Sequence, residues 1–263
     1  MEPLRAAGIA AVLKRLMEAG GAPALTAGVR AEERVDSTNL RLKEAARAGQ
    51  IRPPYLLAAE EQTAGRGRLG RRFVSPPGTG LYMSLLLDAP TDADPGKITV
   101  AAAVAVCRAI EEMTPLTPRI KWVNDIFVRG RKVCGILAER TEAGVVVGIG
   151  VNVLTPPGGF PPEAGIAGAL DTEMDRNELA GRIGAHVLLA MGNLADPALL
   201  TYYRSRMPLI GREITFTQQG QIKKARVTGV GEDGALLILG ENGPEALRSG
   251  EISLGSQSFF GLE

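Results

Sequence analysis

The apolar positions of this chain repeat in two ways, and each predicts a different kind of element. Apolar residues recur at helical spacing in four segments, at residues 4–18, 97–113, 175–193 and 196–206. A run of N-cap formers, Asp36-Ser37-Thr38-Asn39, precedes Leu40–Ala46 and predicts that a further helix begins there. Short continuous apolar runs bounded by turn residues predict buried strands at Tyr55–Ala59, Gly80–Leu87, Arg119–Trp122, Ile126–Val128, Lys132–Glu139 and Val145–Val153. The chain therefore mixes helices and strands over most of its length.

Turn residues indicate how these strands are connected. Arg129-Gly130 and Glu142-Ala143-Gly144 separate consecutive apolar runs, which predicts antiparallel hairpins. Beyond Pro208 only short strands are expected, at Glu213–Thr217, Lys223–Val230, Ala235–Leu239 and Glu245–Arg248. We expect an α+β fold, with a mixed, largely antiparallel sheet and helices on one face, followed by a small β-barrel. The expected divisions are a helical segment at 1–30, a main domain at 31–207 and the barrel at 208–263.

Length and composition narrow the class of protein. The 263 residues are enough for one large domain and one small one, and a formal net charge of +1 argues against general affinity for nucleic acid or membranes. Cys107 and Cys134 lie in apolar contexts without metal-ligand spacing, so we expect a reducing cytoplasm and no disulfide. No signal peptide or membrane span is expected. The single histidine, His186, is predicted to pack in a helix, which argues against catalysis by a histidine base.

The stretch Gly65-Arg66-Gly67-Arg68-Leu69-Gly70 matches the dinucleotide-binding pattern G-x-G-x-x-G. That pattern binds a pyrophosphate only where a strand precedes it and a helix follows it. The residues that follow, 71–80, contain prolines and glycines that break a helix, so the match is false. Four arginines spaced by glycines instead predict a loop that closes on an anion, because arginine offers forked donors to carboxylates and phosphates. A solvated basic loop is the alternative.

Three further segments carry candidate chemistry. Lys121-Trp122-Val123-Asn124-Asp125 ends a predicted strand, where an amide and an acid either form a turn or face a ligand. Lys132 adjoins an apolar strand and is expected to need an anionic partner. Gly148 and Gly150 interrupt the strand before Asn152, which indicates either a close approach of a ligand or a β-bulge.

Together these segments resemble the biotin protein ligases. The motifs occur in that family's order over residues 34–257: Ser37-Thr38-Asn39, Gln62 with Gly65-Arg66-Gly67-Arg68, Lys121 to Asp125, Arg131-Lys132 with Gly135, Gly148 to Asn152, and Ser249-Gly250-Glu251-Ile252-Ser253-Leu254. The resemblance implies a biotin/lipoate ligase-like catalytic domain with an SH3-like C-terminal barrel. It also implies that biotin is activated with MgATP to biotinyl-5′-AMP and then transferred to a lysine of a biotin carboxyl carrier protein.

The resemblance also assigns expected roles. Lys132 and Arg68 are expected at the biotin carboxylate and the α-phosphate, and Asp125 is expected to position or deprotonate the incoming lysine. The implied biotin-binding set is Ser37, Thr38, Asn39, Gln62, Gly65, Arg66, Gly67, Arg68, Lys132, Gly135 and Leu137. The implied ATP-binding set is Arg68, Phe73, Asn124, Lys132, Gly150 and Asn152. No metal-binding motif is present, and Mg²⁺ is expected to arrive on the ATP phosphates.

Two positions depart from the family pattern. Phe73 stands where a tryptophan is usual, and it keeps an aromatic face for adenine with less area. Val123 replaces a usual proline, which removes a turn constraint but no functional group. We expect little loss of chemistry from either.

Alternatives and partners follow from the same resemblance. Lipoate ligases and octanoyltransferases share the implied fold, and an octanoyltransferase would use a nucleophilic cysteine, for which Cys134 is the candidate. A non-catalytic biotin-binding module would have little need for Lys132, Arg68 and Asp125 together. Only 35 residues precede Asp36, too few for a DNA-binding winged helix, so a monofunctional ligase without DNA binding is expected. The expected carrier is that of acetyl-CoA carboxylase or a related carboxylase, and a homodimer is expected.

Overall fold

The structure is a computed structural model that describes residues 1–22, 27–89, 94–218, 221–248, 250 and 252–253. Its helices are α1 (Ala6–Ala19), α2 (Thr38–Arg47), α3 (Pro95–Met113), α4 (Arg176–Met191) and α5 (Pro197–Ser205), with short 3₁₀ turns η1 (Arg68–Gly70) and η2 (Pro162–Ala164). No described helix has the length and apolar character required to cross a membrane.

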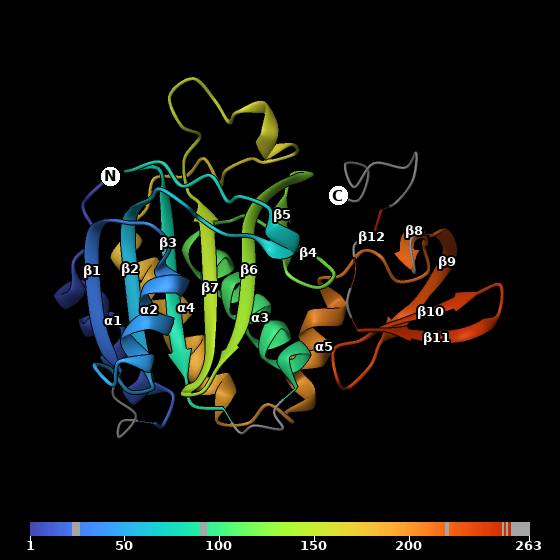
Figure 1. Cartoon of the computed structure of the whole chain (residues 1–263), viewed down its shortest axis with the longest axis horizontal. Helices are drawn as coiled ribbons and strands as arrows, with labels where there is room; N and C mark the ends of the chain where they lie inside the picture. The colour runs from blue at the N-terminus through green and yellow to red at the C-terminus, as the bar shows by residue number, and fades with distance from the viewer. Residues whose placement is uncertain (23–26, 90–93, 219–220, 249, 251, 254–263) are drawn as a thin grey trace.

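Seven strands form the main sheet, in the order β1-β2-β3-β7-β6-β5-β4 (Figure 1). Their bounds are β1 Gly28–Val35, β2 Tyr55–Gln62, β3 Gly80–Leu87, β4 Arg119–Lys121, β5 Asp125–Val128, β6 Arg131–Thr141 and β7 Gly144–Asn152. Only β1 and β2 pair in parallel, and every other pair is antiparallel. The predicted mixed, largely antiparallel sheet is confirmed, with β1 as an additional strand.

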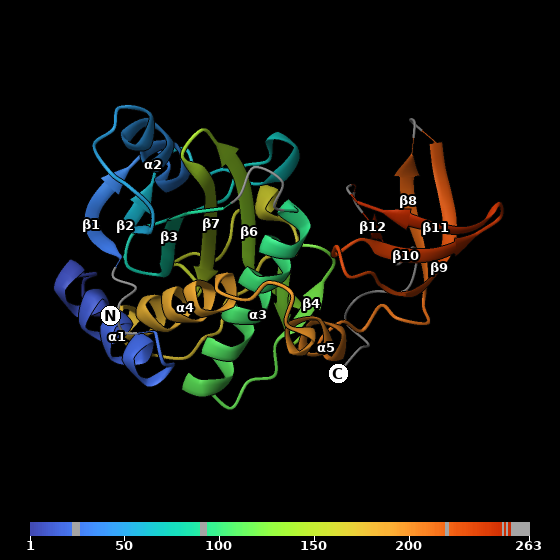
Figure 2. The ribbon, with the colours of Figure 1, turned by 90° about the horizontal axis from the view of Figure 1, so that it is seen from below.

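The two faces of this sheet are covered differently (Figure 2). Alternate residues of a strand point to opposite faces. Leu56, Leu85 and Val147 join the large core beneath α1, α3 and α4, whereas Leu57 and Leu86 join a small core beneath α2. The prediction of helices on one face thus holds for the large core, and α2, the helix predicted after the N-cap residues 36–39, lies on the other face. Beside α2, that face is left for loops and for the cavity described below.

A second sheet follows, with the order β11-β10-β9-β8-β12 and only antiparallel pairs. Its strands are β8 Glu213–Gln218, β9 Gln221–Val230, β10 Leu236–Gly240, β11 Gly243–Leu247 and β12 Ile252–Ser253. The indole Nε1 of buried Trp122 donates to the carbonyl of Gly234 at 2.9 Å, and Arg204 Nε donates to the carbonyl of Val230 at 3.0 Å. These bonds tie the second sheet to the turn after β4 and to α5.

Candidate functional site

A cavity of about 560 Å³ lies on the sheet face that α2 covers. This size is typical of small-molecule sites. Its walls come from the start of α2, the loop 66–74, the turn after β4, strands β6 and β7, and residues 160–167. It is lined by all but one of the residues predicted from sequence: Ser37, Thr38, Asn39, Gln62, Arg66, Gly67, Arg68, Phe73, Asn124, Asp125, Lys132, Gly135, Leu137, Gly150 and Asn152.

The remaining predicted residue, Gly65, shapes the loop from behind the cavity. Gly67 N–H donates to the Arg71 carbonyl at 2.7 Å, and Phe73 N–H donates to the Gly65 carbonyl at 2.9 Å. A Cβ on residue 65 would lie 2.4 Å from the Phe73 carbonyl oxygen, so only glycine lets the two sides of the loop approach. The loop folds back on itself and no helix follows it directly. The dinucleotide pattern would require such a helix, so the match is indeed false.

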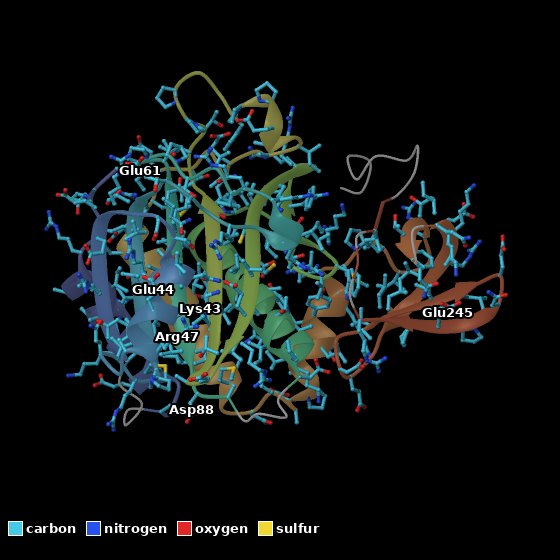
Figure 3. The ribbon with its side chains drawn as sticks, in the orientation of Figure 1. Lys43, Glu44, Arg47, Glu61, Asp88 and Glu245 are labelled. Carbon is cyan, nitrogen blue, oxygen red and sulfur yellow. The ribbon has the colours of Figure 1, made fainter. Side chains whose placement is uncertain are left out.

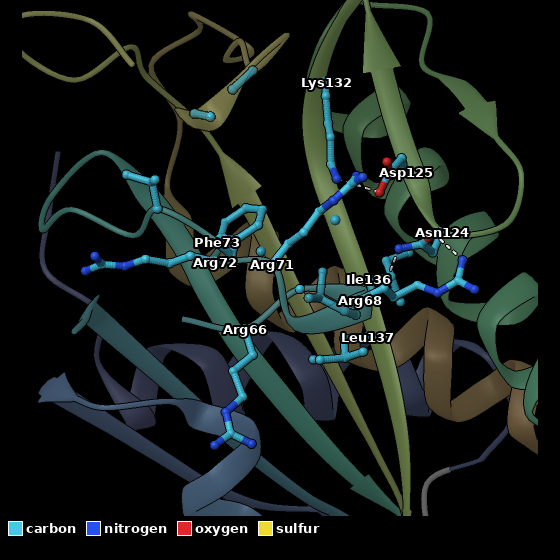
Figure 4. A pocket seen from close by; sticks show the side chains of 18 of the residues that line it. Arg66, Arg68, Arg71, Arg72, Phe73, Asn124, Asp125, Lys132, Ile136 and Leu137 are labelled. Atoms are coloured by element: carbon cyan, nitrogen blue, oxygen red, sulfur yellow. Dashed lines mark hydrogen bonds and ion pairs between the residues drawn. The ribbon is translucent and has the colours of Figure 1, made fainter. Parts of the chain in front are cut away.

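Two pairs of polar side chains, centred on the neighbouring residues Asn124 and Asp125, line the cavity (Figure 4). Lys132 Nζ lies 2.7 Å from Asp125 Oδ1, and both side chains are partly exposed. Arg68 Nη1 donates to Asn124 Oδ1 at 3.1 Å. Asn124 Nδ2 in turn donates to the Ile136 carbonyl at 2.8 Å, which fixes the amide that receives Arg68. A lysine and an arginine are thereby held at one cavity, where they can bind anionic groups.

The four arginines of the loop do not all point the same way (Figure 4). Arg68 points toward Asn124 and Arg71 extends toward the Lys132–Asp125 pair, whereas Arg66 points away from that pair. Arg72 Nη2 donates to the Thr63 carbonyl at 3.0 Å, which holds the loop itself. Arg71 was not among the predicted site residues. Its position inside the same Arg-Gly run was the available signal.

The start of α2 contributes a polar end to the cavity. Ser37 is the N-cap of α2, as its residue type predicted, and its side chain accepts from Leu40 N–H at 3.5 Å. Gln62 Oε1 accepts from Thr38 N–H at 2.9 Å, and Gln62 Nε2 donates to Ser75 Oγ at 3.0 Å. This end is thus built from hydroxyl and amide groups.

Phe73 explains two of the glycines in the sheet. Its ring lies against Gly135 and Gly150, and a Cβ on residue 150 would lie 2.5 Å from Phe73 Cε1. The ring also packs edge-on to Tyr82, with centroids 6.4 Å apart, and burial raises the pKa of Tyr82 to about 12. The close neighbour of Gly150 is therefore a side chain of the loop, which is neither of the two alternatives drawn from sequence.

Asn39 and Asn152 line the cavity, but their amide nitrogens bind the protein. Asn39 Nδ2 donates to the Leu137 carbonyl at 3.2 Å and to Glu139 Oε2 at 2.8 Å. Asn152 Nδ2 donates to the Gly168 carbonyl at 2.9 Å. Both side chains thus hold elements of the wall together, and a direct ligand contact for either remains a prediction.

Several residues of the site carried no separate signal in the sequence. Ser84 and Glu139 connect α2 to the sheet, but neither belongs to a motif in the sequence. Residues 160 and 163–167 also line the cavity, and none of them was among the predicted site residues. Of the C-terminal motif, Ser249, Glu251 and Leu254 lie outside the described residues, while Gly250 and Ile252 line the cavity.

Neither cysteine has the properties of a nucleophile. Cys134 is fully buried and does not line the cavity. Burial raises the pKa of the Cys134 thiol well above its ordinary value, and burial has the same effect on the pKa of Cys107. Because the thiolate is the reactive species, acyl transfer through Cys134 is disfavoured on both access and charge.

His186 does not enter the cavity. It lies on α4 beside α3, with its Nε2 2.9 Å from Glu112 Oε1. Among the described residues no group of three or more His, Cys, Asp or Glu side chains could hold a metal ion. The cavity itself presents Lys132 and arginines, which can bind anions, beside a polar end at Thr38 and Gln62.

Comparisons with known proteins identify the family. Residues 31–154 match the model of the Biotin/lipoate A/B protein ligase family, and residues 209–255 match the Biotin protein ligase C terminal domain. The Biotin--[acetyl-CoA-carboxylase] ligase of Mycobacterium tuberculosis is 34% identical over 68% of this chain and 70% of its own length. The bifunctional ligase/repressor BirA of Bacillus subtilis is 34% identical over 76% of this chain, and the match spans 66% of that relative.

A solved structure shows the same fold. The biotin protein ligase from Aquifex aeolicus in complex with biotin and ATP has a TM-score of 0.72 and 30% identity, and the match covers 85% of this chain and 96% of that chain. Sequence motifs, cavity and relatives thus point the same way, and the chain belongs to the biotin protein ligase family.

Proposed function

We propose that this chain activates biotin with ATP and transfers it to a lysine of a biotin carboxyl carrier protein. The observation that carries the proposal is the placement of Lys132 and Arg68 at one cavity beside the polar end formed by Thr38 and Gln62. A carboxylate and a triphosphate repel each other, so an enzyme that joins them needs fixed cations between them. A cyclic urea needs polar partners at the opposite end of an apolar slot.

The first step joins biotin to adenylate. A carboxylate oxygen of biotin attacks the α-phosphorus, the bond from that phosphorus to the bridging oxygen breaks, and pyrophosphate leaves. Lys132 and Arg68 are proposed to bind the biotin carboxylate and the α-phosphate, and Asn124 holds Arg68 in place. The described residues include no group of three or more His, Cys, Asp or Glu side chains that could hold a metal ion. Mg²⁺ is proposed to enter bound to the ATP phosphates.

The second step forms the amide. The uncharged amine of the carrier lysine attacks the acyl carbon of biotinyl-5′-AMP, and AMP leaves with the bridging oxygen. Asp125 is proposed to position this amine and to accept its proton. In the structure Asp125 is paired with Lys132 at 2.7 Å, so the carboxylate becomes available to the amine once Lys132 binds the substrate anions.

The loop 65–73 is proposed to close over the adenylate. A mixed anhydride that escapes reacts with water or with other amines, so retention matters. Arg68 is positioned to join the loop to the cavity wall through Asn124. Phe73 is proposed to contact the adenine, because its ring lies at the floor formed by Gly135 and Gly150.

Further features of the protein follow from the same proposal. The carrier is proposed to be that of acetyl-CoA carboxylase or a related carboxylase, the reaction named for the Mycobacterium tuberculosis relative. The protein is proposed to work in the cytoplasm, where its two free cysteines stay reduced. A homodimer is proposed because the main sheet ends in edge strands, β1 and β4, that can pair with a second chain.

Calorimetric titration separates this function from its alternatives. Biotin and lipoate are titrated into the chain with and without a non-hydrolysable ATP analogue. A biotin ligase binds biotin selectively and binds the nucleotide more tightly once biotin is present. Selective binding of lipoate would support the lipoate ligase alternative, and biotin binding with no nucleotide binding would support a non-catalytic module.

A further inference from the structure

A chain of hydrogen-bonded polar side chains runs from α2 to β6, buried at Thr38, Asn39 and Ser84 and partly exposed at Glu139 and Lys43. Ser84 interrupts the apolar strand β3 and has no exposed surface. Its Oγ lies 2.6 Å from Thr38 Oγ1 and 2.6 Å from Asn39 Oδ1. Asn39 then reaches Glu139, and Glu139 reaches Lys43. Of these residues only Thr38 and Asn39 line the cavity, so the rest act on a ligand only through them.

The orientation of the Asn39 amide is fixed by its partners. Its nitrogen contacts the Leu137 carbonyl and the Glu139 carboxylate, and both of these groups only accept hydrogen bonds. The amide oxygen must therefore face Ser84. The side chain itself is closely packed, because a Cβ on Gly148 would lie 2.3 Å from Asn39 Oδ1, so its amide can change direction only by exchanging the places of its oxygen and nitrogen.

Ser84 has a single hydroxyl proton and two oxygen neighbours. Asn39 Oδ1 can only accept, so the Ser84 proton goes to Asn39. Ser84 must then receive the proton of Thr38 across the 2.6 Å contact between their hydroxyl oxygens. Thr38 Oγ1 is also 3.1 Å from Gln62 Oε1, but that distance exceeds the usual range of about 2.5–3.0 Å for O–H···O bonds. The Thr38 proton is thus committed to Ser84.

We infer that Glu139, acting through Asn39 and Ser84, is a positioning residue that makes Thr38 a hydrogen-bond acceptor toward the cavity. An acceptor at this point selects a ligand that presents an N–H group there and disfavours one that presents a carbonyl. This inference rests on the proposed function, in which Thr38 lies at the ureido ring of biotin. It adds a remote determinant of which edge of that ring is recognised.

Glu139 can fix the direction of these hydrogen bonds because its own carboxylate is bound by Lys43. Lys43 on α2, on the sheet face that α2 covers (Figure 3), places its Nζ 2.5 Å from Glu139 Oε1. Burial raises the pKa of the Glu139 carboxyl, but hydrogen bonds from Lys43 and Asn39 and the charges of Lys43 and Arg66 outweigh it and lower the pKa overall. The carboxylate therefore stays ionised and acts only as an acceptor.

A near-isosteric substitution should reverse the direction of the hydrogen bonds that run from Glu139 through Asn39 and Ser84 to Thr38. In Glu139→Gln, Lys43 donates to the new amide oxygen, so the amide nitrogen of residue 139 faces Asn39. Asn39 must then turn its own amide, its nitrogen donates to Ser84, and the Ser84 proton moves to Thr38. Thr38 would then present its own proton to the cavity. Adding Lys43→Met frees the glutamine to turn back and restores the original direction.

The experiment measures biotin-dependent pyrophosphate release at varied biotin and at varied ATP. For Glu139→Gln we expect the KM for biotin to rise about tenfold, the scale of one misdirected hydrogen bond, with kcat and the KM for ATP within about twofold of wild type. The double variant Glu139→Gln with Lys43→Met should return toward the wild-type KM for biotin. Recovery on removing a second partner is not expected of a residue that only stabilises the fold.

Controls separate the possible failures. Glu112→Gln removes a carboxylate that binds Arg182 and His186 on the other face of the sheet, and should leave every constant unchanged. Ser84→Ala should raise the KM for biotin without rescue by Lys43→Met, and it carries the test should Glu139→Gln not fold. An unchanged KM for biotin in Glu139→Gln, or a double variant worse than the single one, would overturn the inference. A wild type that releases no pyrophosphate with biotin would instead overturn the proposed function.

Discussion

Alanine at position 150 should disrupt the packing of the loop 65–73 against the sheet, whereas alanine at position 135 should not. Gly135 and Gly150 are paired in register on β6 and β7, and both lie under the Phe73 ring. A Cβ at 150 would lie 2.5, 2.7 and 3.0 Å from three atoms of that ring, while at 135 the nearest ring atom is 3.3 Å away. Carbon atoms attract at about 3.5–4.0 Å, so only the first substitution forces the ring to move.

The magnitude follows from two opposing terms. Overpacking of this kind costs about 1–3 kcal/mol, and replacing a strand glycine by alanine returns about 0.5–1 kcal/mol. Gly150→Ala is therefore expected to lose about 1–2 kcal/mol, which corresponds to a fall in Tm of about 2–8 °C for a chain of this size. Gly135→Ala is expected to stay within about 0.5 kcal/mol of wild type, because its gain offsets its small clash.

The loss of stability is measured by thermal unfolding followed by circular dichroism. The effect on ATP is measured by pyrophosphate release at varied ATP. Because Phe73 is the proposed adenine contact, Gly150→Ala should also raise the KM for ATP, and Gly135→Ala should raise it much less. Equal Tm values for the two variants, or a Gly150→Ala variant at or above the wild-type Tm, would refute the packing of Phe73 described here.

Three further predictions concern other parts of the site. Arg68→Gly should still form pyrophosphate but should release biotinyl-5′-AMP from the cavity. A filter-trap assay that finds wild-type retention of this intermediate would contradict the proposed closure of the loop 65–73. Cys134→Ala should keep the transfer rate within about threefold of wild type, because its buried thiol is not a nucleophile, and a loss of about a hundredfold or more would favour acyl transfer through that residue. Since the folded-state pKa of Glu139 lies below its ordinary value of 4.5, its stabilisation is present above that pH and is lost as pH falls through the folded-state pKa. The difference in unfolding free energy between wild type and Glu139→Gln should therefore be largest near neutral pH and shrink in acid, and a difference that grows in acid would contradict the sign.

The apolar runs were sufficient to predict most of the sheet, because a buried strand must be apolar whatever its neighbours are. β3 has the bounds that were predicted, and the hairpin turns at 129–130 and 142–144 lie between β5, β6 and β7. β1 was missed for the same physical reason. It is an edge strand with four charged residues among its eight, so it shows no apolar run.

The site was predictable where a motif carries its own chemistry and unpredictable where a role depends on a distant partner. Asp125 supplies the anionic partner that Lys132 was expected to need. The neighbour of Gly150 could not be inferred, because Phe73 is 77 positions away and reaches it only through the fold of the loop. Ser84 and Glu139 belong to no motif in the sequence, and only the register of β3, β7 and β6 brings them to α2.

Pyrophosphate release shows whether this cavity joins biotin to ATP. The purified chain is mixed with MgATP, and pyrophosphate is measured on adding biotin, lipoate or octanoate in separate reactions. Pyrophosphate is expected to be released with biotin and little with the other two acids. In Lys132→Met the rate of release with biotin is expected to fall about a hundredfold or more. Equal release with all three acids, or none with biotin, would contradict the proposed function.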